Sequence, residues 1–388
     1  MTVGAEYENW QYVSTPDVGE LKKNSTFLQD TNHDGTNGSI AHPNVTIVGD
    51  AKADMDDATW LYELNGTIYD IYGHDGSAEH PYQISTAYQL LSFAYEVAQG
   101  NNGAGRDFTG KFIRLDADIT LQKSATKTKY ESEDGSGEEP LSWIGIGDDT
   151  HAFNGTFLGG HRYIYRLYGK PLFAKLGSQA KVKQLQVQAL SNGGWNLPVV
   201  TGGGLFAETN AGRISGCRVV GDVKLSGNTT GYAGAFVGNN DSGVIYASYH
   251  VGETKGVGNT ITHVGGLVGN NGNGTISSCY QAGVVSGGAS LNRGIAGDNI
   301  GQNIYNTYFD KSLFDYASPS EHVTPKTTAE MTKPQFVDDL NTGITIWRSS
   351  TETKVIDNGG EGDVYGKGYT DYDNYQYVHQ PANYPKLQ

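Results

Sequence analysis

The sequence Gly265-Gly266-Leu267-Val268-Gly269-Asn270-Asn271 decides the fold, because its pattern recurs at a fixed distance along the chain. The pattern stands 31 residues earlier as Gly234-Ala235-Phe236-Val237-Gly238-Asn239-Asn240, and another 31 earlier as Gly203-Gly204-Leu205-Phe206-Ala207. A period of this length, with glycines at fixed positions and single apolar residues between them, is typical of a solenoid. We therefore expect each 31-residue unit to wind one coil.

Residues one period apart are predicted to form columns that run from coil to coil. Ile214, Ile245 and Ile276 are expected inside, and Ile304 continues the column after a three-residue deletion. Side-chain amides in such stacks can hydrogen-bond from coil to coil. The other predicted columns are Tyr249, Tyr280 and Tyr308, then Asn239 and Asn270, and Asn240 and Asn271.

The spacing of apolar residues within each unit predicts a bend. An apolar residue recurs after three positions, as in Ile214 and Cys217, whereas regular strand alternation would give two. We infer a bend or bulge inside this strand of every coil. The corner glycines Gly221, Gly252 and Gly283 are expected to adopt left-handed backbone angles.

Composition and charge exclude several classes of function. The chain of 388 residues has 54 glycines and a formal net charge of −15. This charge argues against nucleic acid as a partner and against docking on anionic membranes. No apolar run reaches the length of a membrane span, so we expect no membrane insertion. Residues 1–4 do not resemble the start of a signal peptide.

The two cysteines are predicted to be free and buried. Cys217 and Cys279 stand 62 residues apart, which is two full periods. Their backbones are then separated by two strand spacings, roughly 10 Å. This separation exceeds the reach of a disulfide bond.

Outside the repeats, the sequence divides into flanking segments. Residues 1–79 are predicted to form an accessory β segment, in which Asn65-Gly66 is a hairpin signal between Trp60–Leu64 and Thr67–Ile71. Residues 80–310 are predicted to form the solenoid, with repeats over about 203–309. Residues 311–388 are predicted to close the structure.

One helix is predicted at the start of the solenoid. Residues 86–99 carry an apolar stripe at helical spacing, Thr86 and Gln89 match a capping box, and Gly100 is expected to end the helix. Such a helix covers the open end of a solenoid. At the other end, a short helix is predicted near Thr327–Met331, and Trp347 with Tyr384–Leu387 is expected to close the far end.

The repeats, taken with their flanks, resemble the GLUG-motif family of bacterial surface proteins. The resemblance extends from Pro81–Thr86 and Trp143–Gly147 to Thr327–Met331 and Tyr384–Leu387, so that it covers about residues 80–387. It implies an all-β fold, a right-handed parallel β-helix with one N-terminal capping helix, displayed outside the cell. Such regions occur in adhesin-like proteins and before the protease domain of IgA-cleaving metallopeptidases.

The resemblance implies a function without catalysis. The chain has no His-Glu-x-x-His motif, and the family motif marks scaffold residues, so no active site carries over. We therefore expect a non-enzymatic adhesion module at the bacterial cell surface or secreted, in an extracellular setting. Its expected partner is a host glycan or an extracellular protein. A spacer without any ligand is a further alternative.

The enzymatic alternative to an adhesion module is a polysaccharide lyase or glycoside hydrolase on the same fold. Such enzymes need clustered acids in a groove. The acid pairs in the sequence are Asp116 with Asp118 and Asp148 with Asp149. Solvated corners and turns are the competing roles for these residues, because strand alternation places neighbouring side chains on opposite faces.

Two further segments are candidate binding sites. Asp30, Asn32 and Asp34, followed by Gly35, match the first half of a calcium loop, although Ala41 stands where the loop requires Glu. The segment is either a structural calcium site or a polar turn, and no other cofactor is expected. A second candidate is a sugar-stacking face, or alternatively an exposed closing hairpin, made by Tyr365, Tyr369, Tyr372, Tyr375 and Tyr377.

Overall fold

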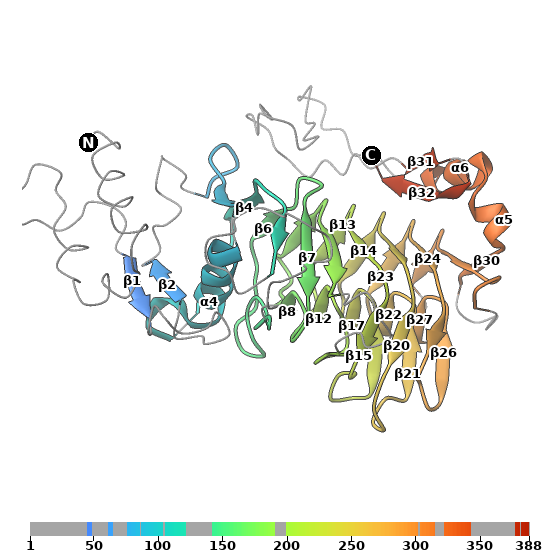
Figure 1. Ribbon diagram of the computed structural model, residues 1–388, viewed down its shortest axis with the longest axis horizontal. Coiled ribbons are helices and arrows are strands. Elements are labelled where there is room, and N and C mark those ends of the chain that lie inside the picture. Colours follow the sequence, from blue (N-terminus) through green and yellow to red (C-terminus); the bar gives the residue numbers. More distant parts are fainter. Residues whose placement is uncertain are drawn as a thin grey trace, which may run out of the picture.

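The computed structural model is a β-solenoid of stacked parallel strands (Figure 1). This architecture confirms the all-β, parallel solenoid predicted from the repeat. The structure describes residues 45–48, 61–64, 76–85, 87–103, 105–121, 142–190, 199–301, 303–314, 322–342, 377–380 and 382–387.

Two eight-stranded sheets run the length of the solenoid. Sheet 1 contains β3 (Tyr82–Ile84), β4 (Phe112–Leu115), β6 (Thr156–Leu158), β9 (Lys181–Lys183), β13 (Arg213–Ser215), β18 (Val244–Tyr246), β23 (Thr275–Ser277) and β28 (Ile304–Tyr305). Sheet 2 contains β5 (Ile119–Thr120), β7 (Tyr163–Leu167), β10 (Gln186–Ala189), β14 (Arg218–Val220), β19 (Tyr249–Val251), β24 (Tyr280–Ala282), β29 (Tyr308–Asp310) and β30 (Thr324–Lys326).

Three shorter sheets complete the coils. Sheet 3 contains β11 (Val199–Val200), β15 (Val223–Leu225), β20 (Thr254–Gly256) and β25 (Val285–Ser286). Sheet 4 contains β16 (Tyr232–Gly234), β21 (His263–Gly265) and β26 (Leu291–Arg293). Sheet 5 contains β8 (Phe173–Leu176), β12 (Ala207–Asn210), β17 (Val237–Asn240), β22 (Val268–Asn271) and β27 (Ala296–Asn299).

The remaining elements flank the solenoid. They are the strands β1 (Val45–Val48), β2 (Leu61–Leu64), β31 (Tyr377–Gln380) and β32 (Asn383–Leu387), and the helices α4 (Ala87–Gly103), α5 (Thr328–Met331) and α6 (Pro334–Thr342). Among the helices of the described part of the chain, none has the length and hydrophobicity needed to cross a bilayer.

The strand register confirms that 31 residues wind one coil. Ile214 pairs with Ile245, Ile245 with Ile276, and Ile276 with Ile304, and all four side chains are buried. Burying the same apolar position in every coil stabilises the stack, and a one-residue slip would move this column out of the core.

The predicted bend lies between sheet 1 and sheet 2. Gly216, Ala247 and Ser278 occupy equivalent positions between paired strands, and all three have positive φ angles, of 64°, 45° and 53°. One left-handed residue turns the chain, so that the residues on both sides of the bend, such as Ile214 and Cys217, are buried in the same core. This geometry explains the three-residue apolar spacing. Of the corner glycines, Gly221 and Gly252 have positive φ, whereas Gly283 does not.

A buried asparagine ladder links the coils of sheet 5. The Nδ2 atom of Asn210 donates to Oδ1 of Asn240 at 2.8 Å, Asn240 donates to Asn271 at 2.8 Å, and Asn271 donates to Asn299 at 2.8 Å. Asn210, Asn240 and Asn271 are fully buried, so these bonds satisfy amides that water does not reach. A second pair, Asn270 to Asn239, bonds at 2.9 Å.

The glycines of the repeated motif allow close approach of backbones. A Cβ atom on Gly265 would contact the carbonyl oxygen of Val268 and would lie 2.5 Å from the backbone nitrogen of Gly297 and 2.7 Å from the carbonyl oxygen of Ile295. The last two residues belong to the next coil. The motif therefore needs glycine here because strands of sheets 4 and 5 pass each other at backbone contact.

Helix α4 covers one end of the stack, as predicted (Figure 1). The ring of Phe93 lies 5.1 Å from that of Phe108 and 5.6 Å from that of Phe153, within one core that continues into the solenoid. The predicted end of the helix is wrong: α4 continues through Gly100 to Gly103, because a single glycine weakens a helix by only about 1 kcal/mol. Gln89 accepts a hydrogen bond from the Ser85 N–H, whereas Thr86 lies outside the described residues.

Helix α6 and strand β32 pack on the side of the solenoid, so Tyr384–Leu387 do not close its end as predicted. The preceding segment does lie at the end, because β30 adds the last strand to sheet 2 and Phe314 and Val323 pack against the main core. Tyr280 and Tyr308 on sheet 2 form a cluster with Phe336 and Leu340 of α6, separate from the main core. The Tyr280 hydroxyl donates to the carbonyl oxygen of Pro385 in β32. The aligned tyrosines therefore provide an anchor for the closing segment. Trp347 lies outside the described residues.

Two local predictions in the flanks have different outcomes. The short helix near Thr327 is confirmed, since α5 begins after a capping box formed by Thr327 and Glu330. The predicted N-terminal hairpin stays a prediction: β2 pairs antiparallel with β1, and its expected partner Thr67–Ile71 is not among the described residues. Residues 65–71 lie outside the described residues.

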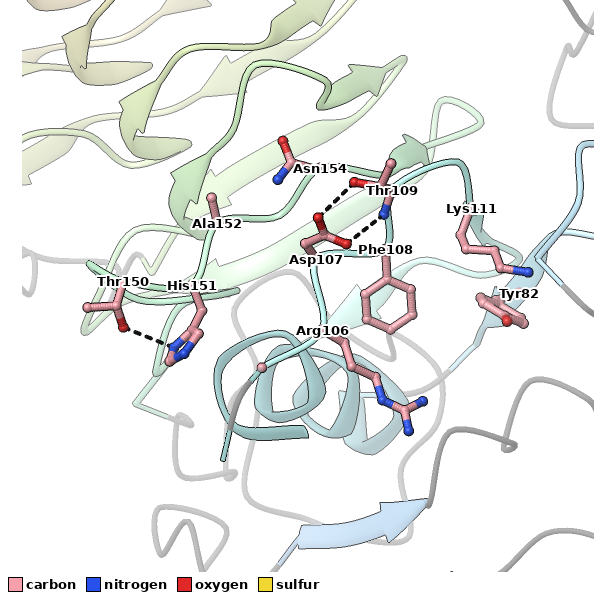
Figure 2. A pocket seen from close by; sticks show the side chains of 11 residues that line it. Tyr82, Arg106, Asp107, Phe108, Thr109, Lys111, Thr150, His151, Ala152 and Asn154 are labelled. Atoms are coloured by element: carbon pink, nitrogen blue, oxygen red, sulfur yellow. Dashed lines mark hydrogen bonds between the residues drawn. The ribbon is translucent and has the colours of Figure 1, made fainter. Parts of the chain in front are cut away.

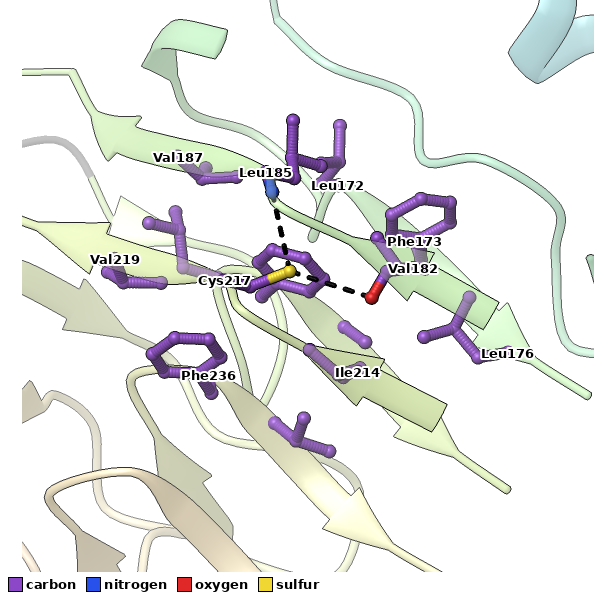
Figure 3. Close-up of a cluster of buried hydrophobic side chains, with 14 of the residues drawn as sticks. Leu172, Phe173, Leu176, Val182, Leu185, Val187, Ile214, Cys217, Val219 and Phe236 are labelled. Carbon is purple, nitrogen blue, oxygen red and sulfur yellow. Dashed lines mark hydrogen bonds between the residues drawn. The ribbon is translucent and has the colours of Figure 1, made fainter. Parts of the chain in front are cut away.

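Cys217 and Cys279 are both free and buried, as predicted. The Cys217 side chain lies among Leu185, Val182 and other core residues (Figure 3). Burial raises the pKa of the Cys279 thiol to about 12, because it outweighs the effect of the hydrogen bonds between the thiol and the backbone.

Both thiols are therefore expected to be unreactive in the folded chain. A thiol-specific disulfide reagent should label neither cysteine in native protein and should label both once the chain is unfolded in urea, since only the thiolate attacks. Rapid labelling of either cysteine at neutral pH without denaturant would contradict the buried positions.

Candidate functional site

A pocket of about 640 Å³ lies beside the end of the solenoid that α4 covers (Figure 2). Its volume falls within the range of small-molecule sites, ~300–1,000 Å³. The lining comes from three places in the sequence: Tyr82 in β3, residues 105–111 after α4, and residues 150–154. Its polar side chains include Arg106, Asp107, Lys111, Thr150, His151 and Asn154.

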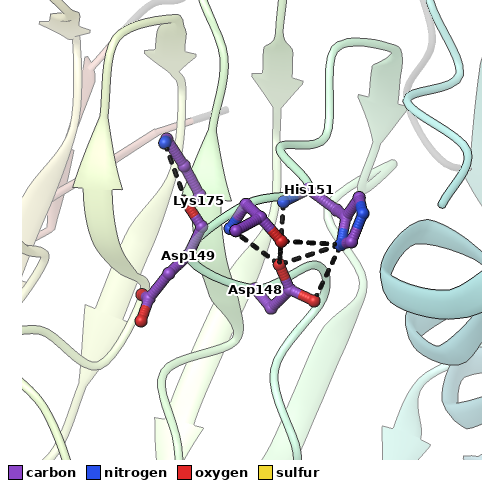
Figure 4. A network of polar contacts seen from close by, with 5 residues as sticks. Asp148, Asp149, His151 and Lys175 are labelled. Carbon is purple, nitrogen blue, oxygen red and sulfur yellow. Dashed lines mark hydrogen bonds and ion pairs between the residues drawn. The ribbon is translucent and has the colours of Figure 1, made fainter. Parts of the chain in front are cut away.

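His151 is held in one orientation by Asp148. The Nδ1 atom of His151 lies 2.9 Å from Oδ2 of Asp148, and the backbone N–H of His151 donates to Oδ1 of the same carboxylate at 2.8 Å (Figure 4). A carboxylate only accepts, so Nδ1 carries the proton in this contact. In the neutral ring, Nε2 is then the acceptor nitrogen, and within the described part of the chain it has no hydrogen-bond partner.

The electrostatics of Asp148 follow from its hydrogen bonds. Partial burial raises the pKa of Asp148, but the hydrogen bonds donated by the side chains and backbones of His151 and Thr150 outweigh it, so that the pKa lies well below its usual range. Asp148 is therefore ionised throughout the neutral range and keeps the His151 ring in place.

The loop after α4 fits closely around His151. A Cβ atom on Gly105 would lie 2.7 Å from Cδ2 of His151 and 2.7 Å from the carbonyl oxygen of Val97. Gly105 has a φ of 71° and Phe108 one of 55°. A positive φ is unusual for an aromatic residue, and the ring of Phe108 is fixed between those of Tyr82 and Phe93. The aromatic core thus fixes the backbone of this wall.

Most charges at the pocket are balanced by neighbours. Arg106 lies 3.2 Å from the buried carboxylate of Glu96. The Lys111 ammonium lies 5.9 Å above the ring of Tyr82. Asp107 accepts hydrogen bonds from the N–H of Thr109 at 3.0 Å and from its hydroxyl at 2.8 Å (Figure 2). The pocket therefore contains donors and acceptors of both signs.

The acids singled out in the sequence do not form one group. Asp116 is paired with Arg114, and Asp118 accepts from the Tyr163 N–H at 2.8 Å. The carboxylates of Asp148 and Asp149 point in different directions (Figure 4). Within the ranges that the structure describes, no three His, Cys, Asp or Glu side chains gather as metal ligands would.

Most residues of the two binding segments expected from the sequence are not among those that the structure describes. Residues Asp30, Asn32 and Asp34 of the calcium candidate lie outside the described residues. So do Tyr365, Tyr369, Tyr372 and Tyr375 of the tyrosine-rich segment, while Tyr377 is the first residue of β31.

Known proteins give no further guidance to this site. No protein family, curated protein or solved structure matched the chain in our comparisons. The pocket itself escaped the sequence analysis because helix α4 and residues 112–149 separate its three segments in the sequence. The one local signal was Asp148 three residues before His151, within a glycine-bounded loop.

Replacing Asp148 with Asn is expected to lower stability at neutral pH but not in acid. Since the folded-state pKa lies below the unfolded value of 3.8, the ionised carboxylate stabilises the fold above that value, and the contribution is lost as the pH falls through the folded pKa. The effect should be modest, because the Asp148 side chain is 38% exposed. Urea unfolding of both proteins from about pH 7 to about pH 2 would measure it. A difference that stays constant across this range would contradict the assignment.

Proposed function

We propose that this chain is a non-catalytic binding module, displayed on a bacterial surface or secreted, that adheres to a host glycan or extracellular protein. The proposal rests on the different positions of the repeated and the non-repeated residues. The repeated residues are buried or lie at backbone contact, as Ile245, Asn240 and Gly265 show. The polar pocket lies instead in non-repeated loops beside the capped end.

This arrangement supports a binding role on physical grounds. A stack of parallel strands with one continuous core is stiff, and loops held on a stiff scaffold bind at a low entropic cost. The net charge of −15 disfavours nucleic acid as the partner. The likeness of the repeats to the GLUG-motif family, in which the motif belongs to the scaffold, is consistent with this proposal.

The test is binding of the purified chain to a glycan array and to a panel of extracellular matrix proteins. We expect specific binding to at least one member of either panel. Silence across both panels would overturn the proposal and favour a spacer without a ligand.

A polysaccharide lyase or hydrolase is the second candidate, favoured by one observation. An imidazole oriented by a carboxylate, as in His151 with Asp148, is an arrangement that general bases use. Incubation with a panel of polysaccharides, followed by assays for new reducing ends and for unsaturated uronides, would decide between the two. Product that disappears in a His151→Phe variant would establish the enzyme.

A further inference from the structure

We propose that the pocket beside α4 binds an uncharged saccharide unit, with Nε2 of His151 accepting a hydrogen bond from a sugar hydroxyl. The inference rests on the proposed binding function and assigns its site and ligand chemistry. It follows from three properties of the pocket: its charge balance, its unused hydrogen-bonding atoms and its shape.

The charge balance favours an uncharged ligand. Arg106 is offset by Glu96 at 3.2 Å. Asp148 is not part of the lining, and its carboxylate already accepts hydrogen bonds from Thr150 and His151. Of the other charged groups on the lining, Lys111 and Asp107 have opposite signs. The charged side chains of the lining, taken together with Glu96, therefore have no excess of either sign, so a carboxylate or an ammonium ion would gain little from them and would still lose its hydration.

The unused hydrogen-bonding atoms fit hydroxyl groups. Asp148 takes up Nδ1 of His151, which leaves Nε2 as an acceptor on the pocket wall. Asn154 uses its Oδ1 to accept from the Gln179 N–H at 3.3 Å, so its Nδ2 remains a donor. Each oxygen of Asp107 already accepts one hydrogen bond from Thr109 and can accept another.

A sugar matches this mixture better than most ligands. Every hydroxyl is at once a donor and an acceptor, and neighbouring hydroxyls need partners of both kinds. The pocket supplies the Nε2 acceptor and the Asn154 donor from one short segment, on either side of Ala152 (Figure 2). Ala152, with Tyr82 and Phe108, adds apolar surface for the C–H face of a sugar ring. The volume of about 640 Å³ accommodates a ligand of disaccharide size.

The site is also built before the ligand arrives. The ring of His151 is wedged against Gly105, and its orientation is fixed by Asp148. The loop carrying Asp107 is anchored by the Phe108 ring in the aromatic core. Such preorganisation reduces the entropy lost on binding.

The experiment uses the full chain labelled with ¹⁵N, and titrates galactose, glucose, N-acetylglucosamine and lactose, with glucuronate as the charged counterpart. The ring nitrogen signals of His151 report its tautomer, and we expect an unprotonated Nε2 whose signal shifts on addition of at least one uncharged sugar. We expect no such shift with glucuronate. Absence of any shift at millimolar concentrations, or a shift with glucuronate alone, would overturn the inference.

Two variants and a control separate recognition from folding. His151→Phe removes the acceptor at similar size, and Asn154→Asp replaces the donor by an acceptor while it keeps the bond from Gln179. Each should weaken sugar binding by about tenfold or more, as expected for one buried hydrogen bond left unpaired. His263→Phe, on sheet 4 and outside the pocket lining, is the matched control and should bind as the parent does.

The outcome also distinguishes this inference from the proposed function. If the chain binds a glycan or matrix protein on the panels, and both pocket variants bind equally well, the function stands and the saccharide pocket is wrong. Should His151→Phe unfold, Asn154→Asp decides alone, because Asn154 is only half-buried and outside the core.

Discussion

Gly265→Ala is expected to prevent folding, or to lower the free energy of unfolding by more than about 4 kcal/mol. The new methyl group would meet three backbone atoms, from Val268, Ile295 and Gly297, and none of these can rotate away as a side chain can. Relief requires two coils to separate, which breaks the ladder bonds between them. Circular dichroism and urea unfolding of the purified variant would measure the loss.

Gly272→Ala is the matched control in the same coil. The nearest atom to its added Cβ would be Nδ2 of Asn270, at 3.9 Å, and Gly272 has no left-handed angle that would strain alanine. We expect a change within about 0.5 kcal/mol. If both variants unfold at the same urea concentration, the motif glycines are not required by backbone contact and their recurrence needs another explanation.

The second large effect is expected at the asparagine ladder. Asn240→Ala should lower the free energy of unfolding by about 3–5 kcal/mol, because it leaves the Asn210 donor and the Asn271 acceptor unpaired and opens a cavity. All three positions are fully buried, so water cannot replace the lost bonds without entering the core. The shift of the urea midpoint, with the slope unchanged, is the measurement.

Asn239→Ala, one residue earlier, tests whether burial of the amide is the cause of the large loss of stability expected for Asn240→Ala. Asn239 is half-buried and accepts one bond from Asn270 at 2.9 Å, which solvent can replace. Its loss should cost at most about 1 kcal/mol. Equal effects at positions 239 and 240 would show that the inner ladder is no more important than the outer one.

The solenoid could be predicted from the sequence because its information is periodic. A column such as Ile214, Ile245 and Ile276 repeats the same environment, so each copy supports the interpretation of the others. The bend between sheets 1 and 2 could also be predicted from the sequence. A left-handed residue at the bend increases the distance between buried apolar residues from two positions to three. The C-terminal end of α4 was predicted wrongly at Gly100. The low helix propensity of glycine there is outweighed by the packing of the preceding part of the helix against the core.

The pocket could not be predicted, because nothing repeats there. Its walls come from segments brought together only when α4 packs on the first coils. The sequence analysis weighed pairs of neighbouring acids only for the alternative enzyme, against roles in corners and turns. In the structure Asp116, Asp118 and Asp148 each have a hydrogen-bond or ion-pair partner and do not form one group. The tyrosine column was found, but not its use as an anchor, since its partners in α6 and β32 lie far along the chain.

The two ends of the solenoid are covered differently, and this difference affects how such a chain can change in length. Helix α4 covers the first coil, whereas β25, β26, β27 and β28 are each the last strand of their sheets. A duplication of one whole 31-residue unit would put every side chain over its own copy, and would lengthen the rod by about 4.8 Å without disturbing the pocket. The distance between the pocket and the C-terminal helices α5 and α6 can therefore be adjusted in steps of one strand spacing, independently of the residues that line the pocket.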